Sequence, residues 1–237
     1  MRGKGFTFKQ FHIDHSRCAM KVGTDGTLLG AWATLPANGR ILDIGTGTGL
    51  IAIMAAQRTV KACITAIDID PDCITQAQEN ATASPWSERI NIVHTPLQEF
   101  ATDEKFDVIV SNPPYFVDSF LSPDAARSTA RHTDTLSFNE LTQGVLRLLS
   151  REGHFALILP QPEMARFLTA ARGRLYVTRR CEVWSTPTSG VRRIMSELSM
   201  TPPQRPPLTE KLIIEDNGPQ GYSEEYRALT RDFYLKF

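Results

Sequence analysis

Short apolar runs alternate with amphipathic stretches through the middle of the chain. Amphipathic, helix-like patterns cover 50–57, 71–83 and about 139–149. Parallel strands need long crossover connections, so this alternation predicts a mostly parallel sheet of the Rossmann-like α/β class. The apolar runs, each expected to be a strand, are 40–43, 62–68, 90–94, 106–111 and 154–159.

The pattern changes in the last third of the chain. Strand-like stretches at 175–184 and 192–200 flank a short polar loop and predict an antiparallel hairpin at the far edge of the sheet. Residues 201–207 hold four prolines and predict a loop. A strand at 211–215 and a closing helix that begins at Ser223 are expected after it.

Length and composition favour one domain. The 237 residues are 41% hydrophobic, enough for one substantial core. We divide it into an N-terminal segment 1–35, a core 40–200 and a C-terminal part 201–237. Lys+Arg and Asp+Glu both number 26, so net charge neither supports nor excludes nucleic acid. The four cysteines lack CxxC spacing and no apolar run could span a bilayer. We expect a cytoplasmic monomer without a metal site.

A glycine-rich turn follows the first expected strand. Gly45, Gly47 and Gly49 lead into a helix, where bare backbone N–H groups can approach a ligand. The spacing is one residue short of the GxGxxG of a dinucleotide site. Asp43 would repel a pyrophosphate, but it suits the amino group and sulfonium of S-adenosylmethionine. The turn therefore favours an S-adenosylmethionine site over a dinucleotide site or a plain β-to-α turn.

Later strand ends supply further candidates for the same ligand. Asp68 ends the second strand, where an acidic group can bind both ribose hydroxyls, and Ile69 follows it. Asp70 precedes a proline, so a helix N-cap explains it fully. After the third strand, Leu97 is expected against the adenine ring and Gln98 at its edge.

The motif Asn112-Pro113-Pro114-Tyr115 follows the strand at 106–111. The Asn112 side-chain oxygen and the Pro113 carbonyl can accept both N–H bonds of one NH₂ group, which localises its lone pair. The second proline stiffens the turn, and the tyrosine can stack on a planar substrate. An ordinary Pro-rich turn is the alternative. The position beyond a strand favours a catalytic clamp for an amine that receives a methyl group.

From about 40 to 159 the chain resembles the seven-strand S-adenosylmethionine-dependent N-methyltransferases, which share a [DN]-P-P-[YFW] loop. Further stretches resemble the bacterial tRNA(Val) adenine N6-methyltransferase family. This resemblance implies methylation of the adenosine immediately 3′ of the anticodon. It also implies that Lys21, with Gln10 nearby, closes over the methionine end of the cofactor and that Thr24 forms part of the wall. The additional stretches are 6–11, 17–26, 28–32, 78–80, 84–90, 222–224 and 229–234.

A tRNA partner requires cations for its phosphates. We expect Arg131, Arg127 and Lys9 to contact RNA, with Arg179 and Arg193 as further candidates, although most such charges are ordinary surface groups. Two other substrates use the same chemistry: a glutamine amide of a protein such as a release factor, and an rRNA amino group. A non-enzymatic RNA-binding module is disfavoured because the residues that chemistry needs are present.

Overall fold

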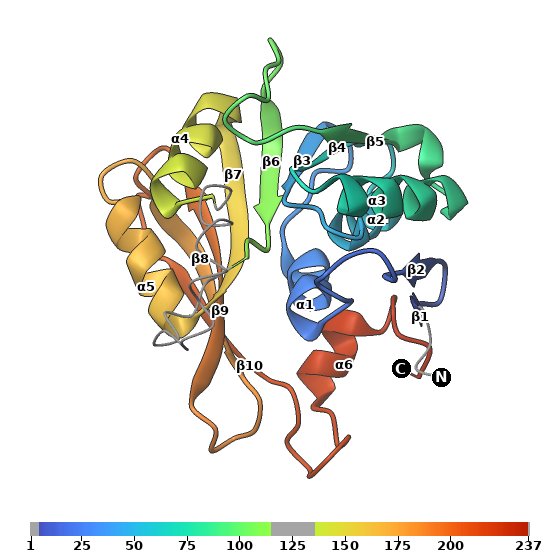
Figure 1. Ribbon diagram of the computed structural model, residues 1–237. Helices are drawn as coiled ribbons and strands as arrows, with labels where there is room; N and C mark the ends of the chain where they lie inside the picture. The colour runs from blue at the N-terminus through green and yellow to red at the C-terminus, as the bar shows by residue number, and fades with distance from the viewer. Residues whose placement is uncertain (1–4, 115–135, 237) are drawn as a thin grey trace, which may run out of the picture.

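The computed structural model describes residues 5–114 and 136–236, which build one eight-stranded sheet and a separate small hairpin (Figure 1). The strand order is β10-β8-β9-β7-β6-β3-β4-β5. The run from β7 to β5 is parallel throughout, which confirms the predicted class of sheet. The bounds of these strands are β3 Arg40–Ile44, β4 Cys63–Asp68, β5 Ile90–His94, β6 Phe106–Ser111 and β7 Leu149–Pro160.

The other end of the sheet contains the expected hairpin. Strands β8 (Tyr176–Trp184) and β9 (Val191–Ser199) pair antiparallel, and β9 also pairs antiparallel with β7. Strand β10 (Leu208–Ile213) adds in parallel outside β8. The antiparallel hairpin is therefore confirmed at this end, with one further strand beyond it.

Helices cover both faces of the sheet (Figure 1). Alternate strand residues point to opposite faces, so Ile41 joins the core beneath α1, α2 and α6, while Leu42 joins the core beneath α4 and α5. Helix α3 packs near β4 and β5. The helix bounds are α1 Thr24–Trp32, α2 Leu50–Arg58, α3 Pro71–Ala83, α4 Phe138–Leu148, α5 Gln161–Ala170 and α6 Glu224–Thr230, with a 3₁₀ turn at Ser87–Arg89.

The sequence analysis did not anticipate α1, α5 or the hairpin of β1 (Gly5–Thr7) and β2 (His12–Asp14). Helix α1 contains two glycines, which lower helix propensity. Gly30 is needed there because an added Cβ would lie only 2.7 Å from the Met54 sulfur of α2. Tertiary packing thus decides the conformation of this segment against its local preference.

The first and last described segments of the chain lie together (Figure 1). The backbone N–H of Lys9 donates to the Phe233 carbonyl at 2.8 Å, and the Phe8 and Tyr234 rings stack with centroids 5.9 Å apart. The chain after β2 then follows α3: the Asp14 N–H donates to Asn80 Oδ1 at 3.0 Å. This path delivers residues 19–21 to the carboxyl ends of β3 and β4.

Across residues 5–114 and 136–236, no helix is long and apolar enough to cross a membrane. The same residues contain no group of three or more His, Cys, Asp and Glu side chains arranged to hold a metal ion.

Candidate active site

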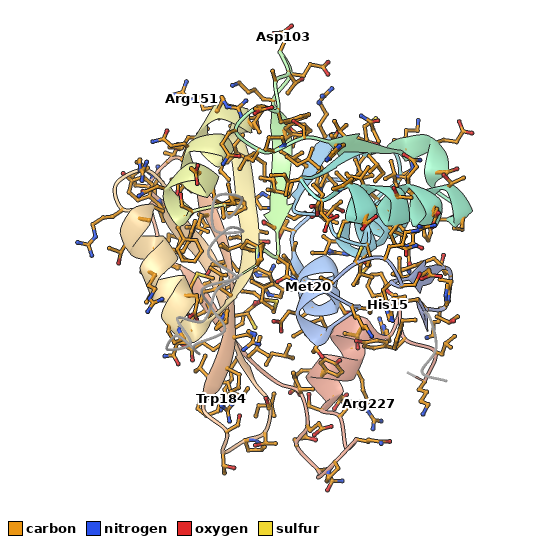
Figure 2. The ribbon with its side chains drawn as sticks, in the orientation of Figure 1. His15, Met20, Asp103, Arg151, Trp184 and Arg227 are labelled. Atoms are coloured by element: carbon orange, nitrogen blue, oxygen red, sulfur yellow. The ribbon has the colours of Figure 1, made fainter. Side chains whose placement is uncertain are left out.

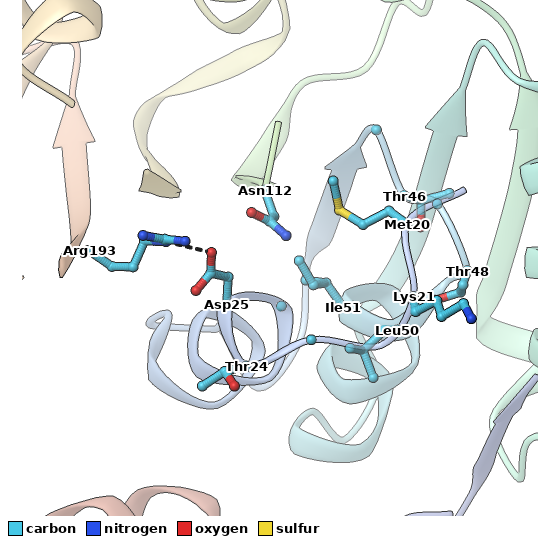
Figure 3. Close-up of a pocket in the computed structure, with 14 residues that line it drawn as sticks. Met20, Lys21, Thr24, Asp25, Thr46, Thr48, Leu50, Ile51, Asn112 and Arg193 are labelled. Carbon is cyan, nitrogen blue, oxygen red and sulfur yellow. Dashed lines mark hydrogen bonds and ion pairs between the residues drawn. The ribbon is translucent and has the colours of Figure 1, made fainter. Parts of the chain in front are cut away.

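Two adjoining cavities lie where the carboxyl ends of β3, β4 and β6 meet. The first cavity, about 410 Å³, lies between the start of α1, the glycine turn and the start of α2 (Figure 3). The second cavity, about 610 Å³, is lined by the end of β4, residues 95–99 and the start of α4. Met20, Gly45, Gly47 and Asn112 line both cavities. The cavities therefore form one cleft with Asn112 at its junction.

The glycine turn owes its shape to three left-handed residues. The φ angles are 70° at Gly45, 55° at Gly47 and 81° at Gly49, a region that other L-residues rarely adopt. A Cβ added at Gly45 or Gly47 would meet no atom within 4 Å, because both residues border the cleft. The N–H groups of Gly45 and Thr46 donate to the Ile67 carbonyl and join the turn to β4. The turn therefore presents bare backbone to the cleft.

Asp43 lies behind this turn rather than in the cavity wall. Its Oδ2 accepts a 2.6 Å hydrogen bond from the Thr46 hydroxyl, and Thr46 lines the first cavity. Its Oδ1 is buried and has no hydrogen-bond partner in the described part of the chain. Burial raises the pKa of Asp43 to about 7, with a further contribution from the Asp68 charge. A cation bound in the first cavity would stabilise the ionised form, so the site fits the cationic end of S-adenosylmethionine.

Asp68 occupies the corresponding position at the end of β4. Its Oδ2 accepts from the Gly47 N–H at 2.8 Å and its Oδ1 from the Asp70 N–H at 3.0 Å. The carboxylate lines the second cavity, and each oxygen keeps a lone pair for a hydroxyl donor. Ile69 is 47% exposed and lines the same cavity.

Asp70 has the structural role that its sequence context indicates. It is the N-cap of α3, where it accepts from the N–H groups of Asp72 at 2.8 Å and Cys73 at 3.3 Å, with Pro71 at the first helical position. This confirms the N-cap role of Asp70, which lines the second cavity beside Asp68.

The Asn-Pro-Pro-Tyr motif begins directly after β6. The Ser111 hydroxyl donates to the Ile44 carbonyl at 2.8 Å, which fixes the end of β6 against the end of β3. Asn112 follows at the junction of the two cavities, Pro113 is buried, and Pro114 lines the second cavity. Tyr115 lies outside the described residues, as do Arg127 and Arg131.

The first cavity is completed by residues far apart in the sequence. Lys21, Thr24 and Asp25 contribute from the N-terminal segment. Arg193 of β9 lines the same cavity, and its Nε donates to Asp25 Oδ2 at 2.7 Å (Figure 3). Met20 projects beside α1 near the middle of the molecule (Figure 2). The sequence analysis did not assign Met20 to the site. It did not anticipate the ion pair of Asp25 with Arg193 either, because these residues are 168 positions apart and no local pattern predicts such a contact.

Three other candidate residues, Gln10, Lys9 and Arg179, line neither cavity. Gln10 is exposed. Lys9 Nζ donates to the Arg231 carbonyl at 2.5 Å, which connects it to the C-terminal part. Arg179 pairs with Glu210 at 3.1 Å and stacks over the Trp32 ring at 4.2 Å. These arginine contacts stabilise the packing of α1 against the hairpin end of the sheet.

Comparisons with known proteins agree with this geometry. The Methyltransferase small domain model matches residues 18–140. The chain is 49% identical over 234 residues to a tRNA1(Val) (adenine(37)-N6)-methyltransferase of Parabacteroides distasonis, covering 98% of each chain. It is 46% identical over 239 residues to the Photobacterium profundum enzyme of the same name, covering 98% of this chain and 99% of that one.

The fold has solved counterparts. A structure described as a predicted O-methyltransferase from Agrobacterium tumefaciens superposes with a TM-score of 0.67 at 19% identity, covering 88% of this chain and 96% of that one. The sheet, the glycine turn and the cleft thus define a class I methyltransferase. Within that class, the chain belongs to the tRNA1(Val) (adenine(37)-N6)-methyltransferase family.

Proposed function

We propose that this protein transfers the methyl group of S-adenosylmethionine to the exocyclic N6 of adenosine 37, the nucleoside immediately 3′ of the anticodon, in tRNA1(Val). The position of Asn112 carries the chemical part of the proposal, because it lines both cavities at the point where cofactor and acceptor must meet. The printed names of the near-full-length relatives support the tRNA part.

The described residues can hold both ends of the cofactor. Asp68 accepts from the ribose hydroxyls, and Leu97 packs against adenine in the second cavity. Helix α1 has no side-chain N-cap bond, so its first N–H groups and Lys21 attract the cofactor carboxylate in the first cavity. Asp43 adds negative potential beneath the ammonium and sulfonium groups.

Asn112 and Pro113 prepare the acceptor nitrogen. Bound S-adenosylmethionine supplies an electrophilic methyl group. The N6 lone pair of adenine is conjugated with the ring and is a poor nucleophile. The Asn112 oxygen and the Pro113 carbonyl accept the two N–H bonds and favour a pyramidal nitrogen whose lone pair points at the methyl group. The nitrogen becomes acidic only on gaining the methyl group, so no earlier general base is required.

The tRNA must present an unstacked base to this clamp. Bases of the anticodon loop are partly free, which lowers the cost of extrusion. We assign stacking on that base to Tyr115, and phosphate contacts to Lys9, Arg127 and Arg131. We further propose that the enzyme works in the cytoplasm and that it is a monomer. Light scattering of the purified protein would test the monomeric state.

Transfer of radiolabelled methyl groups tests the proposal directly. The protein is incubated with labelled S-adenosylmethionine and, separately, with total tRNA, rRNA and a release factor. Nucleoside analysis of the labelled tRNA should give N6-methyladenosine from the anticodon loop. Label on a release-factor glutamine, with none on tRNA, would overturn the substrate but leave the clamp mechanism intact. Absence of label from the tRNA, the rRNA and the release factor alike would refute the proposed methyltransferase activity.

A further inference from the structure

One face of α4 holds the loop that follows β5. Glu140, Gly144 and Arg147 are spaced four and three residues apart, so they lie on the same side of the helix. The Arg147 guanidinium donates to the Leu97 carbonyl at 2.7 Å and to the Phe100 carbonyl at 2.5 Å. Gly144 leaves so little room that an added Cβ would lie 2.5 Å from the Leu97 side chain. The helix thus fixes the wall of the second cavity from behind.

Glu140 makes the contact nearest the cleft. Its Oε1 accepts from Gln98 Nε2 at 3.0 Å, and both residues line the second cavity. Its Oε2 accepts from the Ser137 hydroxyl at 2.7 Å and from the Ser137 N–H at 2.9 Å. The Ser137 and Gln98 hydrogen bonds hold the pKa of Glu140 below its usual range, so the carboxylate stays ionised.

An ionised carboxylate accepts hydrogen bonds and donates none. The Gln98 amide must therefore turn its NH₂ toward Glu140, because the opposite orientation would place two acceptor oxygens together. This leaves Gln98 Oε1 as the group presented to a ligand. An acceptor at that position pairs with the 6-amino group of adenine and not with the 6-oxo group of hypoxanthine.

We propose that Glu140 is a positioning residue that selects a 6-aminopurine in the cofactor by fixing the orientation of the Gln98 amide. The inference rests on the cofactor assignment of the proposed function and extends it to a residue that does not touch the reacting atoms. It predicts that discrimination between purines depends on a side chain that acts through Gln98.

Calorimetry with two product-like ligands tests the proposal without methyl transfer. The wild type should bind S-adenosylhomocysteine at least about tenfold more tightly than S-inosylhomocysteine, in which a 6-oxo group replaces the 6-amino group and N1 carries a hydrogen. Glu140→Gln keeps the size of the side chain and remains compatible with a capping box, but its amide accepts either orientation of Gln98. In this variant, and in Glu140→Ala, the affinity ratio should fall to about threefold or less, because Gln98 can then donate to the 6-oxo group.

Ser137→Ala is the matched control. It removes the N-cap hydroxyl of α4 together with its hydrogen bond to Glu140 Oε2, and should lower the melting temperature. The Ser137 N–H bond to Glu140 and the Glu140 contact with Gln98 remain, so the ratio should be kept. A ratio unchanged in both Glu140 variants would overturn the proposal, because a purely structural role weakens both ligands equally. Absence of discrimination in the wild type would overturn it too. Failure of the wild type to bind either ligand would instead refute the cofactor assignment itself.

Discussion

The two cavities of the cleft are built by different means. The first cavity is assembled from distant segments and carries charge: Asp25 of α1 meets Arg193 of β9, and Asp43 is buried behind the turn. The second cavity is lined by the end of β4 and by residues 95–99, and α4 supports the loop that carries Leu97 and Gln98. We therefore expect charge to contribute most to cofactor binding in the first cavity, and the shape and hydrogen-bond polarity of Leu97 and Gln98 to decide base recognition in the second. Substitutions should separate these two contributions.

The largest effect is expected where the cavities meet. Asn112→Ala removes an acceptor that is needed as the amine becomes pyramidal, so kcat should fall by about a hundredfold or more. Cofactor affinity should barely change, because the other lining residues remain. Single-turnover methylation of tRNA, together with calorimetry for S-adenosylhomocysteine, measures both quantities.

Asn112→Asp provides the control for this prediction. It retains an oxygen that can accept an N–H bond, and the related loops tolerate aspartate at this position. Its kcat should therefore exceed that of Asn112→Ala. Wild-type turnover in the alanine variant would remove Asn112 from the mechanism.

The next effect separates a buried carboxylate from one that lines the cleft. Asp43→Ala and Asp68→Ala should each weaken S-adenosylmethionine by at least about tenfold, consistent with loss of a charge-assisted interaction. Only Asp68→Ala should also lose affinity for adenosine alone, because Asp68 lines the second cavity and Asp43 lines neither. Unchanged S-adenosylmethionine affinity in both variants, measured by calorimetry, would refute the assignment of the cradle.

The pH dependence of S-adenosylmethionine affinity tests the role of the Asp43 charge without a substitution. The pKa of Asp43 is about 7, so S-adenosylmethionine affinity should fall by up to about fivefold between pH 7 and pH 6 as the buried charge is lost. Adenosine affinity should change much less over this range. Asp43→Asn should flatten the S-adenosylmethionine profile, and an equally steep profile in that variant would assign the titration to another group.

The same shift affects the stability of the ligand-free protein. The folded-state pKa of Asp43 is raised from 3.8, so between these two values the folded state binds more protons than the unfolded state. The contribution of Asp43 to the free energy of unfolding therefore decreases as the pH rises from about 3.8 to about 7. Denaturant titrations at several pH values give the free energy of unfolding. Across this window it should fall with rising pH more steeply in the wild type than in Asp43→Asn.

Local patterns were sufficient for much of the fold and for the glycine turn after β3. The core strands and the N-cap role of Asp70 follow from rules that operate within a few residues. The partnership of Asp25 with Arg193 does not, because it depends on how α1 is placed against β9. Gln10 is exposed and lines neither cavity, so its place near the cofactor stays a prediction from the resemblance.

Helix α4 shows an intermediate case. Its capping box at Ser137 and Glu140 can be read from the sequence as a helix start. The contact of Glu140 with Gln98 could not be predicted from the sequence, because it requires the loop after β5 to lie against the same face of α4. Sequence rules specify the element, and tertiary packing decides which of its side chains serve the site.

The smallest expected effect tests the shape of the second cavity. Gly144→Ala gains roughly 1 kcal/mol of helix propensity, but its Cβ would lie 2.5 Å from the Leu97 side chain. The end of a leucine side chain can move, so the net change in folding stability should be small. The movement narrows the second cavity, and affinity for S-adenosylhomocysteine should fall by about threefold to tenfold.

Two variants test this assignment to Leu97. Gln143 is exposed on the neighbouring face of α4, so Gln143→Ala should leave the affinity for S-adenosylhomocysteine unchanged. Adding Leu97→Val to Gly144→Ala removes one carbon from the crowded contact, so the double variant should bind better than the sum of the single effects predicts. Strictly additive losses in calorimetry would show that Gly144 acts on the ligand through some route other than Leu97.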